Sequence, residues 1–166
     1  DKGPFVIRYP RGRGHLVDWK CPMHEIAVGT GVQLKDGDSV AVLTLGPIAY
    51  EAQKAIETAE REAHERGETL SVAHYDMRFL KPLDTDLLDQ IAARFSHVVT
   101  IEDGVVNGGL GTAVLEYLSD HDCAVRVKRL GLPDSFVEHG TVGQLYEIVG
   151  LDYKSIAREI TNFVKH

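Results

Sequence analysis

Residues 39–67, SVAVLTLGPIAYEAQKAIETAEREAHERG, decide the fold, because a buried-type strand is followed directly by a helix. Residues 39–45 form a continuous apolar run, which is typical of a strand covered on both faces. After Gly46 and Pro47, apolar side chains recur at steps of three and four residues, the spacing of an amphipathic helix. Gly67 then predicts the end of that helix. A buried strand leading into such a helix indicates a parallel α/β sheet.

The same alternation continues on both sides of this stretch. A short β-like segment at residues 25–34 and a turn at residues 36–38 precede it. Strands are expected at residues 69–78, 97–102 and 124–130, and helices at residues 86–95, from about 111 to 119, 142–149 and 153–164, with Asp84 or Thr85 as an N-cap and a loop over residues 132–140. We therefore expect an α/β fold with a mostly parallel sheet covered by helices on both faces.

Length and composition exclude several classes of protein. The 166 residues include 18 Lys and Arg against 25 Asp and Glu, a net charge of −7. No apolar run approaches the roughly 20 residues that cross a bilayer, and we expect no membrane partner. The acidic balance disfavours nucleic acid as a partner, so any anion site must be local.

The cysteines and the first residue bear on the setting of the chain. Cys21 and Cys123 lie far apart in the sequence and show no metal-ligand spacing, which argues against a disulfide framework or a zinc site. A reducing, cytoplasmic compartment fits this usage best. Because the chain begins with Asp1, we expect it to be a piece of a longer protein.

A basic cluster near the start is the first candidate site. Arg8, Arg11 and Arg13 lie beside Pro10 in an otherwise acidic chain. Guanidinium groups match phosphate oxygens in pairs, so a phosphorylated small molecule is one possible ligand. The alternative is a solvated linker whose arginines pair with carboxylates. We expect residues 1–24 to be the last strand of a preceding domain plus a linker.

Two further candidates follow the strand at residues 97–102. Residues 107–112, NGGLGT, open a helix, where exposed amides could hold an anion, although the turn could equally be glycine-rich for close packing. Glu102 and Asp103 end the strand, where parallel sheets place functional groups. The alternative for either carboxylate is a bond to neighbouring loop amides or to an arginine.

The histidines and a cationic turn complete the candidates. His74 and His139 are the histidines next to possible orienting carboxylates, and neither has metal-ligand spacing. Arg78 and Lys81 follow the strand at residues 69–78 and could face a ligand or a partner. A turn held by Asp84 would explain the same residues.

Several of these motifs occur together, in order, across nearly the whole chain. They are VIRYPRG at 6–12, DMRFLKPLD at 76–84, TIED at 100–103 with GGLG at 108–111, and GLPDSFVEHG at 131–140. In this combination the chain resembles the C-terminal part of the 1-deoxy-D-xylulose-5-phosphate synthases. The glycine and carboxylate signature is shared with transketolases and 2-oxoacid dehydrogenase β subunits, whereas RYPRG with GLPDSFVEHG is similar to the synthases specifically.

The resemblance implies a three-layer α/β/α sandwich around a five-stranded mixed sheet with one antiparallel strand, formed by residues 25–166. Enzymes of that family join pyruvate to glyceraldehyde 3-phosphate with loss of CO2, which supplies isoprenoid, thiamine and pyridoxal precursors. They use thiamine diphosphate and Mg2+, which two other domains hold. By resemblance, the present chain has no catalytic residue and no metal ligand, binds no cofactor by itself, and contributes a surface to a homodimer.

The resemblance also assigns roles to individual residues. An arginine of RYPRG faces the phosphate of the triose phosphate, with Arg11 the first choice and Arg8 the second. Arg78, Lys81, Glu102 and His139 are expected to support the site or to make interdomain contacts. Two other interpretations remain open: the C-terminal domain of a transketolase or 2-oxoacid dehydrogenase β subunit, and a self-sufficient anion-binding module using residues 108–112.

Overall fold

Strand β2 (Val40–Leu45) is the centre of the molecule, and its first five residues are buried. The computed structural model describes residues 3–4 and 22–165. The apolar run that predicted a strand covered on both faces is therefore confirmed. Gly46, which has a φ of 82°, turns the chain out of β2 and into the first helix.

The sheet has five strands in the order β1-β3-β2-β4-β5. Strands β3 (Val72–Asp76), β4 (His97–Val105) and β5 (Arg126–Leu132) run parallel to β2. Edge strand β1 (Val32–Lys35) runs antiparallel to β3. The expectation of a mostly parallel mixed sheet with one antiparallel strand is confirmed.

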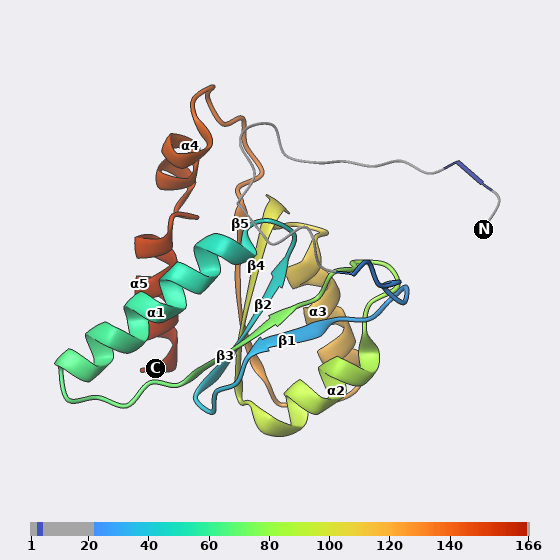
Figure 1. Ribbon diagram of the computed structural model, residues 1–166, viewed down its shortest axis with the longest axis horizontal. Helices are drawn as coiled ribbons and strands as arrows, with labels where there is room; N and C mark the ends of the chain where they lie inside the picture. The colour runs from blue at the N-terminus through green and yellow to red at the C-terminus, as the bar shows by residue number, and fades with distance from the viewer. Residues whose placement is uncertain (1–2, 5–21, 166) are drawn as a thin grey trace.

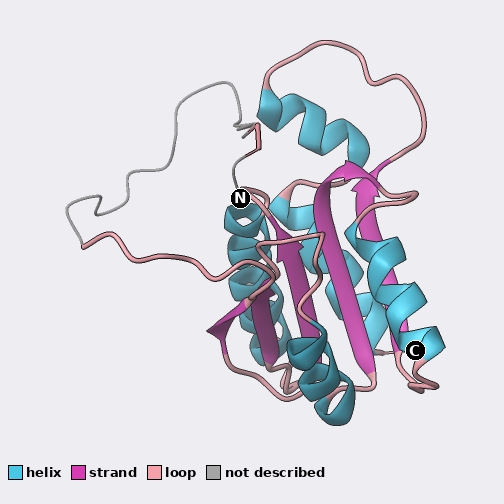
Figure 2. Ribbon diagram, turned by 90° about the vertical axis from the view of Figure 1, so that its right-hand side faces the viewer, coloured by secondary structure: helices cyan, strands magenta, loops and turns pink. Residues whose placement is uncertain are grey.

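Helices cover both faces of this sheet (Figures 1 and 2). Helices α1 (Ala49–Glu65) and α5 (Tyr153–Val164) form one layer, and α2 (Thr85–Arg94) and α3 (Leu110–Asp120) form the other. Helix α4 (Val142–Val149) lies beyond the ends of β4 and β5 (Figure 1). The fold is the expected three-layer α/β/α sandwich.

Each helical layer encloses its own apolar core against the sheet. Alternate residues of a strand point to opposite faces, so neighbouring residues of β2 belong to different cores. Val40 and Val42 face α1 and α5, whereas Ala41 and Leu43 face α2 and α3. No helix in the described part of the chain is both long enough and apolar enough to cross a membrane.

The β-like reading of residues 25–34 is wrong for most of that segment. Residues 22–31 form a loop and a turn, in which the Thr30 amide donates to the Ala27 carbonyl at 3.3 Å. Gly29 has a φ of 79°, and a Cβ there would lie 2.8 Å from Pro82. The loop therefore packs tightly on the turn before α2, which short-range sequence patterns do not reveal.

Candidate functional site

Glu102 is a buried carboxylate near the carboxyl end of β4, with 4% of its surface exposed. Its Oε2 accepts a hydrogen bond from the Leu110 amide at 2.8 Å, and its Oε1 accepts one from the Gly111 amide at 3.0 Å. These amides belong to the first turn of α3, where a negative charge is favourable. Glu102 thus caps a helix, which confirms the interpretation that its carboxylate is bonded to neighbouring amides.

Gly109 makes this cap sterically possible. A Cβ at this position would lie 1.9 Å from Glu102 Oε2. Because the internal carboxylate already occupies the amides of Leu110 and Gly111, these groups are not available to an external anion. The structure therefore favours the close-packing interpretation of residues 107–112 over the anion cradle.

Arg129 on β5 fastens the loop between β4 and α3. Its Nη1 donates to the Val106 carbonyl at 3.1 Å and to Thr112 Oγ1 at 3.0 Å. Thr112 Oγ1 in turn accepts from the Gly108 amide at 3.0 Å. Sequence reasoning did not identify Arg129, because only the register of β4 and β5 brings it to this loop.

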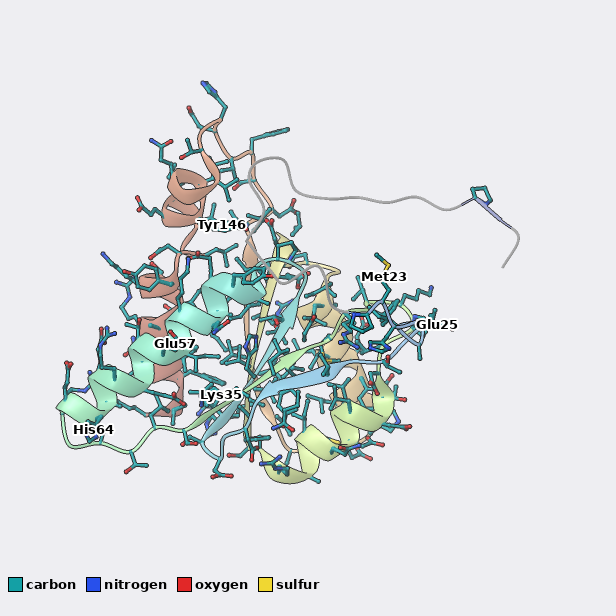
Figure 3. All side chains as sticks on the ribbon, in the orientation of Figure 1. Met23, Glu25, Lys35, Glu57, His64 and Tyr146 are labelled. Carbon is teal, nitrogen blue, oxygen red and sulfur yellow. The ribbon has the colours of Figure 1, made fainter. Side chains whose placement is uncertain are left out.

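Asp103 connects the same edge of the sheet to α4. The hydroxyl group of Tyr146 donates to Asp103 Oδ2 at 3.2 Å. Burial, together with the negative charge of Asp103, raises the pKa of Tyr146 to about 12, so the hydroxyl keeps its proton. Tyr146 therefore positions α4 beyond the carboxyl ends of the strands (Figure 3).

His74 lies inside the domain rather than at a site. It is 2% exposed, and its Nε2 lies 3.0 Å from Thr44 Oγ1, which itself donates to the Tyr75 carbonyl. Burial lowers the pKa of His74 to about 4, although the charge of Asp76 opposes this shift. His74 is thus neutral at pH 7 and serves packing.

Arg78 and Lys81 lie in the exposed turn after β3. Arg78 has a φ of 55°, an unusual value for a residue other than glycine, and its amide donates to Asp76 Oδ1 at 2.9 Å. Neither side chain forms an ion pair with another described residue. Asp84 bonds instead to the loop before β1 and to α2: its Oδ2 accepts from the Gly31 amide at 2.7 Å and its Oδ1 accepts from the Leu87 amide at 2.9 Å.

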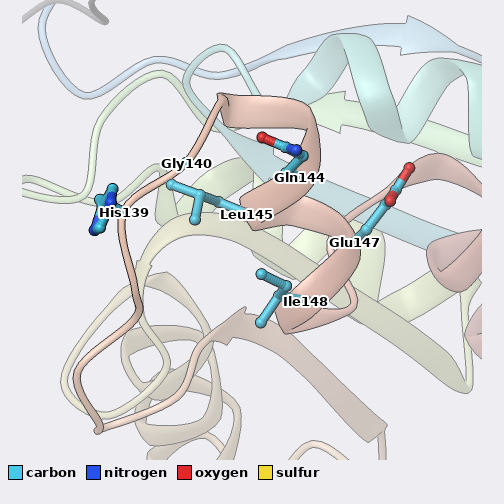
Figure 4. Close-up of a pocket in the computed structure, with 6 residues that line it drawn as sticks. All are labelled: His139, Gly140, Gln144, Leu145, Glu147 and Ile148. Atoms are coloured by element: carbon cyan, nitrogen blue, oxygen red, sulfur yellow. The ribbon is translucent and has the colours of Figure 1, made fainter.

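His139 lines an open pocket of about 440 Å³ between the loop after β5 and α4 (Figure 4). Leu145 and Ile148 supply its apolar lining, and Gln144 and Glu147 supply polar groups. Glu138 makes no hydrogen bond to His139 among the described residues. His139 is therefore exposed, and Glu138 does not orient its ring as the sequence suggested.

The predicted site residues do not converge on one centre. Arg8 and Arg11 lie outside the described residues, and no hydrogen bond or ion pair joins any two of Arg78, Lys81, Glu102 and His139. Within residues 22–165, no group of three or more His, Cys, Asp or Glu side chains could hold a metal ion.

The strand order, the antiparallel edge strand and the capped α3 define a class of α/β sandwich domains with two helical layers. A family model described as transketolase, C-terminal domain, matches residues 29–156. The chain therefore belongs to the transketolase C-terminal domain family.

Two bacterial relatives are similar over almost the whole chain. A protein of Bacteroides thetaiotaomicron named 1-deoxy-D-xylulose-5-phosphate synthase is 56% identical over 160 residues, which are 96% of this chain and 24% of that protein. A protein of the same name from Phocaeicola vulgatus is 56% identical over 98% of this chain and 25% of its own length. The chain thus spans about a quarter of the curated relatives that it matches.

Solved structures share the fold. One is described as "Split gene transketolase, inactive beta4 tetramer", where beta4 refers to the assembly and not to a strand. It matches with a TM-score of 0.71 and 32% identity, over 87% of this chain and 44% of that chain. A transketolase of Pichia stipitis, in complex with sedoheptulose 7-phosphate, matches with a TM-score of 0.53 and 10% identity over 82% of this chain and 18% of its own. At that identity the second likeness shows the fold alone.

Proposed function

We propose that this chain is the C-terminal domain of a 1-deoxy-D-xylulose-5-phosphate synthase. The main support for this proposal is the 56% identity, over 96% of the chain, to a protein of that name. In this proposal the full-length enzyme condenses pyruvate with glyceraldehyde 3-phosphate and releases CO2. Thiamine diphosphate and Mg2+ are held by parts of the polypeptide upstream of this chain. The enzyme is a cytoplasmic homodimer.

The domain's own role is to support the enzyme rather than to make or break bonds. Residues 1–24 are the end of the preceding domain and a linker, and residues 25–166 are the C-terminal domain. Glu102 supports the fold by capping α3, and Arg78, Lys81 and His139 meet other parts of the enzyme. The exposure of these last three side chains supports this role.

The alternatives have weaker support. A transketolase role draws on a likeness at 32% identity to a split-gene transketolase, well below the identity to the synthases. A self-sufficient anion-binding module using residues 108–112 is disfavoured, because Glu102 already accepts hydrogen bonds from the first amides of α3.

The test is the reaction itself. The full-length enzyme is expected to form 1-deoxy-D-xylulose 5-phosphate from pyruvate and glyceraldehyde 3-phosphate. The 166 residues alone, supplied with thiamine diphosphate and Mg2+, are expected to form none. Product formed by the 166 residues alone would refute the supporting role, and its absence from reactions of the full-length enzyme would refute the reaction.

Arg11 is proposed to bind the phosphate of the triose phosphate, with Arg8 as the second candidate. In the full-length enzyme, Arg11→Ala is expected to raise KM for glyceraldehyde 3-phosphate at least about tenfold, because a charge-assisted hydrogen bond is lost. KM for pyruvate should change little. Arg61→Ala, which removes an exposed guanidinium from α1, is the matched control. An unchanged KM for the triose phosphate in the Arg11 variant would contradict this role.

A further inference from the structure

Helix α4 meets the core along one side, and part of its apolar surface stays in solvent. Tyr146 and Val149 pack against the core between the sheet and the α1/α5 layer. Ile148 is 69% exposed, and Val142, the first residue of the helix, is 53% exposed. Folding of the described residues therefore leaves apolar surface of α4 in contact with solvent.

The loop before α4 carries a large aromatic side chain that also lies in solvent. Phe136 is fully exposed, and it is the most exposed large apolar residue of those described. The pocket between His139, Leu145 and Ile148 lies on the same loop and helix (Figure 4). Phe136, Val142, Leu145 and Ile148 form what we call the α4 surface. An apolar centre with polar groups around it is the composition of an interface.

The α4 surface is held in place by its own contacts. Thr141 and Gln144 form a capping box at the start of α4, and the Tyr146 hydroxyl donates to Asp103 at the sheet edge. Gly140 lets the loop pass close to the helix, because a Cβ there would lie 3.3 Å from Leu145. A partner would therefore meet a surface that is already ordered, which lowers the entropic cost of binding.

We propose that the α4 surface binds a basic, partly apolar surface on the polypeptide upstream of this chain. This inference rests on the proposed function in that it requires this chain to be the last domain of a longer enzyme. The first support is length, since about three quarters of each close relative lies outside the matched region. The second is position, since α4 lies beyond the strand ends, outside the three layers (Figure 1).

Charge decides between this occupant and a second copy of the same surface. Residues 133–149 contain the carboxylates Asp134, Glu138 and Glu147 and no Lys or Arg. Two copies of the α4 surface placed face to face would bring like charges together, which is unfavourable. A partner surface with apolar side chains would match the apolar side chains of the α4 surface. Lys or Arg beside them would match its carboxylates.

Photo-crosslinking in the full-length enzyme tests this proposal. A benzophenone amino acid replaces Phe136 in one variant and Ile148 in another, and a third variant carries it at Glu57, which is exposed on α1 (Figure 3). Mass spectrometry of an equal mixture of isotopically light and heavy subunits then identifies the crosslinked peptides. We expect positions 136 and 148 to crosslink to sequence upstream of this chain, and position 57 not to do so.

Other outcomes would overturn the proposal. These are crosslinks from position 136 or 148 to residues 22–165 of a second copy, no crosslink from either position, and equal crosslinking to upstream sequence from position 57. As a second measurement, Ile148→Glu in the full-length enzyme should speed amide exchange over residues 133–148 about tenfold, whereas Ile148→Met should not. Unchanged exchange in Ile148→Glu would also overturn it. Product formation by the unmodified enzyme reports separately on the proposed reaction.

Discussion

At the scale of single residues, the helix cap formed by Glu102 depends on Gly109. The carboxylate receives two amide hydrogen bonds only because glycine leaves room for it. Buried carboxylates are tolerated where such donors replace water. The sequence TIED followed by GGLG contains both partners, yet it does not say that they touch.

Gly109→Ala is expected to destabilise the domain by about 3 kcal/mol, because the added methyl group would displace the Glu102 carboxylate from its donors. Denaturant unfolding followed by circular dichroism measures this change. Gly143→Ala, at a helical position with no atom within 4 Å of the added Cβ, is the control. It should stay within about 1 kcal/mol of wild type, on the stabilising side. Equal effects of the two substitutions would contradict the cap.

His74 predicts a pH dependence of stability. Its pKa is about 4 in the folded state, against 6.5 for an ordinary histidine, because burial disfavours the charged form. The unfolded chain therefore binds more protons between these values. Stability is at its full value above pH 6.5 and falls as the pH drops toward 4, by about 3 kcal/mol in total from this residue.

His74→Gln should remove this loss of stability at low pH, because glutamine does not titrate, while keeping a nitrogen donor near Thr44. The free energy of unfolding, measured from pH 7 to pH 4, should fall less steeply in the variant than in the wild type. His64→Gln, at an exposed position on α1 (Figure 3), should leave the slope unchanged. Parallel curves for wild type and His74→Gln would show that His74 does not titrate as the buried geometry requires.

At the scale of elements, Asp84 joins a helix to a distant loop. Its Oδ1 accepts from the Leu87 amide at 2.9 Å and caps α2, while its Oδ2 accepts from the Gly31 amide at 2.7 Å. The N-cap was predictable, since Asp before a helical pattern is a common start signal. The bond to Gly31 was not, because that loop is far away in sequence.

Asp84→Ala is expected to destabilise the domain by about 2 kcal/mol, since two backbone amides lose their acceptor. The amide of Gly31 should also exchange faster with solvent, which hydrogen exchange detects by NMR. Asp86→Ala changes an exposed carboxylate in the first turn of the same helix and should have a much smaller effect. If Gly31 exchange were the same in wild type and Asp84→Ala, the proposed link between loop and helix would be absent.

At the scale of the whole molecule, the sheet separates two cores that share its strands. Ile160 belongs to the core beneath α1 and α5, and Ile91 belongs to the core beneath α2 and α3. Because β2, β3, β4 and β5 each contribute residues to both cores, we expect the two cores to unfold together in one transition.

Ile91→Val and Ile160→Val should each cost about 1 kcal/mol, and the double variant about 2 kcal/mol, because residues in separate cores do not share partners. Ile156→Val with Ile160→Val provides the comparison, since these two residues lie one turn apart in one core and can couple. Unfolding curves followed by fluorescence and circular dichroism give these values. Two separate transitions would show that the layers unfold independently.

Local patterns were enough for most of the fold. The apolar run at residues 39–45, the helical spacing after it and Asp84 at the start of α2 depend on neighbours a few residues away, so they could be predicted. Strand limits were less accurate: β3 begins at Val72 rather than at residue 69, and β4 runs to Val105 rather than to residue 102. Pairing with the adjacent strand determines where a strand ends.

The sequence by itself determined the α/β class, the order of most elements and the likeness to the synthases. The tertiary structure alone decided what the polar residues do and which large apolar side chain stays exposed. It placed Glu102 on the α3 amides, His74 inside a core, Arg129 on the loop after β4 and Phe136 in solvent. The physical reason is that secondary structure follows from short-range periodicity, whereas burial and hydrogen-bond partners depend on which distant segments the sheet brings together.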